Sequence, residues 1–141
     1  MGTGSRDVKR LELPSCVESL HEVVDVAAQI TSDLAMSEDA CDEVAIALTE
    51  AVNNAIFHGN EGVREKPFRV EFTVVDGMLD IAVLDQGPGF DPEEVPDPLA
   101  EENLLNPSGR GLLMMRAMVD DVQHQFCDAG TRVVLRKRIA S

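Results

Sequence analysis

The dipeptide Asp76-Gly77 is the feature that most narrows what this chain can fold into. It joins two runs, residues 68–75 (FRVEFTVV) and 78–84 (MLDIAVL), in which apolar and polar residues alternate. A period of two predicts strands with one buried face, and Asp-Gly favours a two-residue turn whose twist matches theirs. The turn fixes the register of a β-hairpin, in which the predicted facing pairs are Val74 with Leu79, Phe72 with Ile81, and Val70 with Val83.

Helical periodicity precedes the hairpin. A short alternating strand, residues 9–13, is followed by apolar residues at three- and four-residue spacing over residues 15–36. Ser37, with acids directly after it, is typical of a helix N-terminus. We therefore expect a second helix over residues 37–58, ended by Gly59.

The rest of the chain completes an α+β pattern. Residues 91–108 contain four Pro, six acids and no base, which predicts a long loop. A glycine turn should lead into a helix over residues 109–119, followed by strands over 122–127 and 131–138. This order predicts a single domain over residues 1–141, with a disordered start (residues 1–8) and helices on one face of a mostly antiparallel mixed sheet. The last strand carries Arg132, Arg136, Lys137 and Arg138, which favours a charged edge strand.

Charge and hydropathy exclude several classes of protein. Twelve Lys and Arg stand against 26 Asp and Glu, a formal charge of -14, so direct binding to nucleic acid or to an anionic membrane surface is not expected. The longest apolar run, residues 44–48, is far shorter than the roughly 18 residues of a spanning helix. The first ten residues contain no apolar stretch that could serve as a signal peptide. We expect a cytoplasmic protein.

One stripe of the second helix carries an unusual set of polar residues. Glu50, Asn54 and His58 follow one another at i, i+4 spacing, so they should project from one side of the helix. A solvated face is one interpretation. However, Asn53-Asn54 is a poor helix-forming pair, and an amide tolerated there is typical of a side chain that ligates a hard cation through oxygen.

Asp85 continues the core-facing row of the second hairpin strand. A buried carboxylate needs a donor, because leaving it without one costs several kcal/mol. Two interpretations are open: the carboxylate accepts hydrogen bonds from amides of the following turn, or it accepts one from a ligand's amino group. Gly87 and Gly89 would let a ligand ring approach the backbone in the second case.

A third feature is Gly109-Arg110-Gly111 at the start of the last helix. Free amides at a helix N-terminus, together with a guanidinium, form an anion site, although a glycine turn before a helix is also common for structural reasons alone. Neither glycine pair completes a G-x-G-x-x-G motif, and no P-loop is present. The two common nucleotide motifs are therefore absent.

Together these features resemble a known family. EAVNNAIFHG (residues 50–59), DQGPGF (85–90), SGRGLL (108–113) and the later Gly-Thr pair (130–131) are similar to the N, G1 and G2 boxes of the GHKL ATPase superfamily. Within it the chain most resembles the anti-sigma factor serine-protein kinases of the RsbW and SpoIIAB type. The resemblance implies a Bergerat-type two-layer sandwich that holds ATP beneath a lid, residues 91–108.

The resemblance also implies roles for single residues. Glu50 would be the general base for a partner's serine hydroxyl, Asn54 would hold Mg²⁺ against the phosphates, and Asp85 would accept the adenine amino group. Thr131 would lie near the base. The other residues that the resemblance assigns to the nucleotide are His58, Gly87, Gly89, Ser108, Gly109, Arg110, Gly111 and Leu112, of which Gly109 to Leu112 would wrap the phosphates.

The partners implied by the resemblance are proteins. The family suggests a homodimer that sequesters a sigma factor or an equivalent target and phosphorylates a STAS-domain antagonist on serine. The acidic lid, with Arg110 the one cation near the phosphates, leaves open a second hypothesis: a nucleotide-gated binding protein without kinase activity. A third, the ATP domain of a histidine kinase, needs a helical phosphoacceptor hairpin for which 141 residues leave no room.

Overall fold

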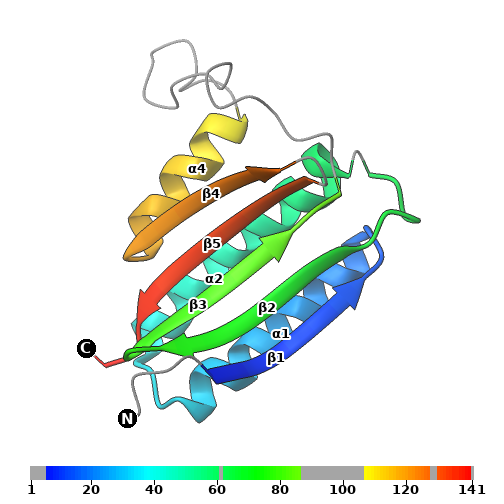
Figure 1. Ribbon diagram of the computed structural model, residues 1–141. Helices are drawn as coiled ribbons and strands as arrows, with labels where there is room; N and C mark the ends of the chain where they lie inside the picture. The colour runs from blue at the N-terminus through cyan, green and yellow to red at the C-terminus, as the bar shows by residue number, and fades with distance from the viewer. Residues whose placement is uncertain (1–5, 61, 87–106, 128–129, 141) are drawn as a thin grey trace.

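The computed structural model describes residues 6–60, 62–86, 107–127 and 130–140, and Figure 1 shows their arrangement. The elements in chain order are β1 (Arg6–Leu13), α1 (Val17–Asp33), α2 (Glu38–Asn53), a π-helical turn η1 (Asn54–Gly59), β2 (Phe68–Val75), β3 (Met78–Leu84), α4 (Pro107–Met118), β4 (Asp121–Cys127) and β5 (Gly130–Arg138).

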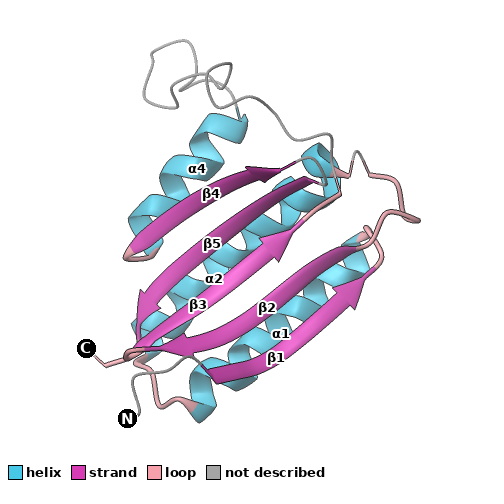
Figure 2. Cartoon of the chain, in the orientation of Figure 1, coloured by secondary structure: helices cyan, strands magenta, loops and turns pink. Residues whose placement is uncertain are grey.

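The strands form one sheet and the helices cover one of its faces. The strand order is β1-β2-β3-β5-β4, and all four pairings are antiparallel. Figure 2 shows α1, α2 and α4 lying together behind the sheet. The predicted α+β class, with helices on one face, is confirmed, and the expected mixed sheet is antiparallel throughout the described strands.

The predicted hairpin is confirmed in bounds and register. Asp76 and Gly77 both have positive φ, 50° and 78°, as a two-residue turn of type I′ requires. The three predicted facing pairs are the observed ones. Phe68, Val70 and Phe72 of β2 are fully buried, so the row that faces the helices supplies the centre of the core.

The prediction of a charged edge strand is wrong. β5 lies between β3 and β4, and the edges of the sheet are β1 and β4. Arg136 makes a two-pronged ion pair with Asp80 of β3, at 2.8 and 2.9 Å, on the face without helices. Lys137 points the other way and donates to the Met118 carbonyl at 2.9 Å. The basic residues that suggested an edge strand therefore belong to β5, an interior strand of which one face is not covered by helices.

The second helix changes geometry before it ends. α2 stops at Asn53, and η1 continues it with wider turns, in which the Asn60 N–H donates to the Ala55 carbonyl five residues earlier at 2.8 Å. The predicted α-helix to His58 is therefore wrong in its last turn. The change falls at Asn53-Asn54, where two weak helix formers follow each other, and Gly59 closes the turn as expected.

Candidate functional site

The candidate site lies where β3 ends beside the start of β5. The Asp85 N–H donates to the Thr131 carbonyl at 3.0 Å, and the Thr131 N–H donates to Asp85 Oδ1 at 3.1 Å. In a regular antiparallel pair, two facing residues exchange two hydrogen bonds, each from a backbone N–H to a backbone carbonyl. Here the Asp85 side-chain carboxylate, in place of its carbonyl, accepts the bond from the Thr131 N–H. Asp85 is half-buried and Thr131 is buried. The backbone of the two strands thus orients this carboxylate.

Two glycines allow the chain to approach Asp85 closely. A Cβ added at Gly59 would overlap the Asp85 carboxylate, with Oδ2 the nearest atom. A Cβ added at Gly130 would overlap the Asp85 carbonyl oxygen, and Gly130 also has a positive φ of 145°. The end of η1, the end of β3 and the start of β5 therefore meet at one acidic residue, and only glycine fits at either contact.

Asn60 links this corner to the rest of the fold. It is completely buried, and its Nδ2 donates to Ser15 Oγ and the Lys66 carbonyl, both at 2.9 Å, and to the Pro67 carbonyl at 3.3 Å. Its Oδ1 accepts the Gln86 N–H at 2.7 Å, directly after Asp85. Sequence reasoning missed Asn60. The available signal was an asparagine immediately after a helix-ending glycine, where a side chain can bond nearby backbone groups.

Two of the three polar residues predicted on the second helix have described side chains. Glu50 is in the last turn of α2 and Asn54 is the first residue of η1, and both are half-buried. Because Gly59, at the end of η1, contacts Asp85, the end of this helical segment lies beside the end of β3 (Figure 1). His58 also belongs to η1, and its side chain lies outside the described part of the structure.

The predicted phosphate-binding residues are described only in part. Gly87, Gly89 and residues 91–106 of the predicted lid lie outside the described residues. α4 begins at Pro107, two residues before the expected start, so the predicted glycine turn at 109–111 is helical instead. Pro at the first helical position favours this earlier start. Ser108, Gly109 and Arg110 therefore lie in the first turn of α4, where backbone amides lack helical partners. Gly111 and Leu112 lie beyond it, where the amides donate within the helix.

A histidine under α4 has a perturbed titration. His124 of β4 is largely buried, and this burial lowers the pKa of its imidazole, to which the nearby Arg116 cation adds a smaller effect in the same direction. Arg116 belongs to the last turn of α4. Burial therefore favours the neutral form of this imidazole.

Comparison with known proteins identifies the family. The sequence matches the family model described as "Histidine kinase-like ATPase domain" over residues 13–137. The chain belongs to the histidine kinase-like ATPase family. Relatives of this family member include serine-protein kinase RsbW of Listeria monocytogenes, 30% identical over 78% of this chain and 73% of that protein. RsbW of Bacillus licheniformis is 32% identical over 77% and 71%, and an anti-sigma F factor of Clostridium perfringens is 31% identical over 69% and 71%. The predicted resemblance to RsbW-type proteins is confirmed.

Solved structures show the same ATPase fold. The RsbU and RsbW domains of a Mycobacterium tuberculosis protein match with a TM-score of 0.67 at 19% identity, over 93% of this chain and 32% of that one. This ATPase-family chain thus spans about a third of that protein. A histidine kinase domain from a blue-light activated kinase of Erythrobacter litoralis matches with a TM-score of 0.57 at 16% identity, over 89% and 61%. Within the described residues, no helix is both long and apolar enough to cross a membrane.

Proposed function

We propose that this chain is an ATP-dependent protein-serine kinase and a partner-switching anti-sigma regulator. It would phosphorylate a STAS-domain antagonist on serine and sequester a sigma factor or an equivalent target, as a homodimer. The observation that carries the proposal is Asp85, an acceptor held by the Thr131 amide and by contact with Gly59, at the end of the helix that carries Glu50 and Asn54. The names of the RsbW and anti-sigma F relatives support the protein-kinase and anti-sigma parts.

The corner at Asp85 fits the adenine end of a nucleotide. A carboxylate fixed by backbone contacts is a preorganised acceptor for an exocyclic amino group. Thr131 would lie beside the base, and Gly87 and Gly89 would bound the adenine pocket. ATP, when bound, supplies the phosphoryl group that is transferred.

The phosphates and the metal would lie between the helices. The first turn of α4 offers the backbone amides of residues 108–110, and Arg110 would add a cation. His58, which the family resemblance assigns to the nucleotide, would also contact it. Among the described residues, no group of three His, Cys, Asp or Glu could hold a metal ion. Asn54 is the proposed protein ligand to Mg²⁺, which commonly keeps several waters and bonds to substrate phosphates.

Glu50 is the proposed general base. It lies one helical turn before Asn54, which would place its carboxylate next to the metal-bound phosphates. From there Glu50 would orient the partner's serine hydroxyl and accept its proton as the serine oxygen bonds to the γ-phosphorus of ATP, with ADP as the leaving group. Phosphoryl transfer depends mainly on such positioning and on neutralised charge, which the Glu50 carboxylate and a bound Mg²⁺ would supply.

Substitution of Glu50 tests the assignment. Glu50→Ala should bind ATP as tightly as the parent chain does and form phosphoserine on a purified STAS-domain antagonist at least about 100-fold more slowly. Glu22→Ala, which removes an exposed carboxylate from α1, is the matched control and should leave both quantities unchanged. Undiminished transfer by Glu50→Ala would remove the general-base role.

A nucleotide-gated binding protein without kinase activity is the second candidate function. It is favoured by the predicted lid, residues 91–108, whose six acids and lack of bases weaken its attraction for phosphates. Incubation of labelled ATP and Mg²⁺ with the antagonist separates the two functions. A phosphoserine product excludes the pure binder, whereas ATP-dependent partner binding without any labelled product excludes the kinase.

A further inference from the structure

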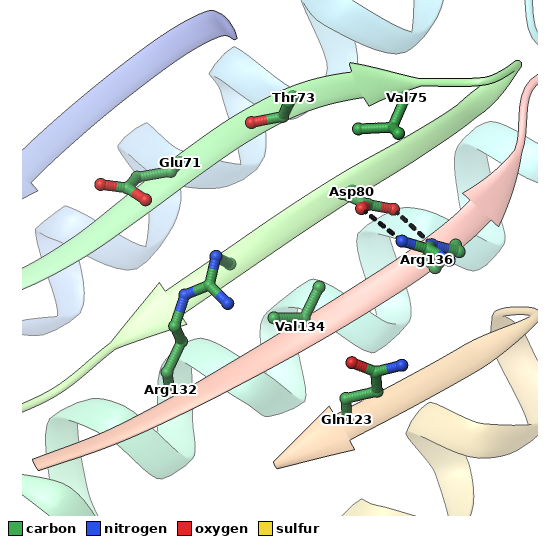
Figure 3. A pocket seen from close by; sticks show the side chains of 9 residues that line it. Glu71, Thr73, Val75, Asp80, Gln123, Arg132, Val134 and Arg136 are labelled. Atoms are coloured by element: carbon green, nitrogen blue, oxygen red, sulfur yellow. Dashed lines mark hydrogen bonds and ion pairs between the residues drawn. The ribbon is translucent and has the colours of Figure 1, made fainter. Parts of the chain in front are cut away.

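One lysine of β5 lies in the row of side chains that faces the helices. Side chains of a strand alternate between its two faces, so Arg136 points to the uncovered face, where it lines a shallow hollow and pairs with Asp80 (Figure 3). Lys137 points toward the helices instead, in the same row as the buried Val133 and Leu135. Its side chain is 14% exposed, and lysine is seldom so deeply buried unless it is paired. The row suits an apolar side chain, so the charge at this position needs an explanation.

The ammonium group of Lys137 joins two helices. Its Nζ donates to the carbonyl oxygen of Met118, the last residue of α4, at 2.9 Å. The same Nζ lies 3.5 Å from Oε2 of Glu43, near the start of α2. The last carbonyls of a helix lack helical partners, and a cation beside them also stabilises the negative end of the helix dipole. Lys137 thus ties the C-terminal end of α4 to α2 through one largely buried charge.

The two helices are matched in length beyond this tie. α2 and α4 pack side by side and run in opposite directions (Figure 1). In α4, eleven residues separate Met118 from Pro107, about 16 Å at 1.5 Å per residue. The same number separates Glu43 from Asn54, and Glu50 lies almost two full turns after Glu43, on the same side of α2. A tie at one end therefore brings the first turn of α4 level with Glu50 and Asn54 at the other end.

We propose that Lys137 is a positioning residue for the phosphate end of the nucleotide site. The inference rests on the proposed ATP site and goes beyond it by assigning a residue that does not touch the nucleotide. By holding α4 to α2 at one end, Lys137 fixes how far the amides of the first turn of α4 lie from Glu50 and Asn54. A displacement of about 1 Å there can slow a reaction on the order of 100-fold, because reacting groups must meet within narrow limits.

The adenine corner should not depend on Lys137. It is formed by the ends of η1 and β3 and by the start of β5, which meet at Asp85. α4 contributes to the phosphate end alone. Loss of the tie should therefore weaken binding of the phosphates and leave recognition of the adenine ring unchanged, a separation that a general loss of stability could not produce.

Lys137→Met tests the inference, because it removes the charge and keeps a long side chain beside the apolar Leu135. An apolar residue can replace a buried ion pair at little cost, so the urea midpoint should change little. Affinity for ATP with Mg²⁺, measured by calorimetric titration, should fall about 10-fold, and phosphoserine formation on the antagonist at saturating ATP should slow by about 10- to 100-fold. Affinity for adenosine, which has no phosphates, should stay within about 2-fold in a chemical-shift titration.

Three further variants make the result specific. Lys9→Met makes the same chemical change at an exposed position of β1 and should alter none of these quantities. Lys137→Arg keeps the cation and its donors, so it should recover most of the ATP affinity and of the transfer rate. Glu43→Met removes the other half of the ion pair at a partly exposed helix position and should cause a smaller loss of the same kind. It decides the matter if circular dichroism shows that Lys137→Met does not fold.

Two results would overturn the inference: a full ATP affinity and transfer rate in Lys137→Met, or an adenosine affinity that falls as much as the ATP affinity does. Failure of the proposed function gives a different pattern. A parent chain that binds ATP and forms no phosphoserine rejects the kinase, while the two affinities still decide the role of Lys137. A parent chain that binds no ATP rejects both proposals.

Discussion

Gly59 lies directly against the Asp85 carboxylate, so the last residue of the π-helical turn and the first residue after β3 share one contact. Because the same carboxylate accepts the Thr131 N–H, three segments that are far apart in the sequence depend on it. Any side chain at position 59 would displace the acidic group proposed to recognise adenine.

Gly59→Ala should therefore impair both stability and nucleotide binding. The added Cβ overlaps the carboxylate, and such overpacking costs about 1–3 kcal/mol. Urea unfolding and calorimetric titration with ATP measure the two effects. Gly77→Ala is the control: its Cβ meets no atom, but its positive φ makes alanine unfavourable, so it should lose stability and keep its ATP affinity. Equal ATP affinities for the parent chain and Gly59→Ala would show that the corner is only structural.

Asp85→Asn should weaken ATP binding about 10- to 100-fold with little loss of stability. The amide oxygen can still accept the Thr131 N–H, whereas the charge that strengthens a bond to an amino group is lost. Asp76→Asn makes the same chemical change in the hairpin turn, where asparagine also tolerates positive φ, and should alter neither property. Calorimetric titration measures the affinities. Retention of full affinity by Asp85→Asn would contradict the adenine assignment.

Asn60→Ala should lower the free energy of unfolding by about 3 kcal/mol, a large loss for the substitution of a polar residue. It removes the acceptor of the Gln86 N–H and the donor to two carbonyls in a fully buried place. Asn53→Ala replaces a half-buried asparagine in α2 with a better helix former and should be neutral or slightly stabilising. Chemical unfolding of both variants measures the difference. A loss below 1 kcal/mol at Asn60 would mean that the corner does not depend on this network.

His124 should make the protein less stable in mild acid. Its pKa is lower in the folded protein than in the unfolded chain, so the unfolded state takes up more protons once the pH falls below about 6.5. The free energy of unfolding should then decrease as the pH drops further. His124→Asn should reduce this slope between pH 7 and 5, and His21→Asn, at an exposed position of α1, should not. Urea unfolding across this pH range provides the measurement, and parallel slopes for the parent chain and His124→Asn would contradict the expectation.

Local sequence patterns predicted much of this fold, whereas features that depend on contacts between distant segments were missed. The hairpin register followed from Asp76-Gly77 because a two-residue turn leaves the strands no freedom to slip. The interior place of β5 was not readable, because its charges suit an edge strand and an uncovered face equally well. Its position depends on pairing with β3, some 50 residues away.

The site was predicted in the same uneven way. Asp85 stood out because a carboxylate in a core-facing row needs a donor, but nothing local named the Thr131 amide as that donor. Asn60 gave a weaker signal still, since its partners come from three separate segments that only the folded chain brings together.

The π-helical turn is in effect a one-residue insertion that the fold has absorbed. α2 keeps its ordinary pitch where Leu48 and Val52 pack in the core, and the surplus residue is accommodated in η1. If all six residues of η1 took regular α-helical pitch instead, each would advance by about 100° rather than by the smaller π-helical step, and Gly59 would be carried away from Asp85. The widened turn therefore sets the angle at which Gly59 meets Asp85, so a substitution that restores regular pitch in η1 should disturb the acidic corner without touching it.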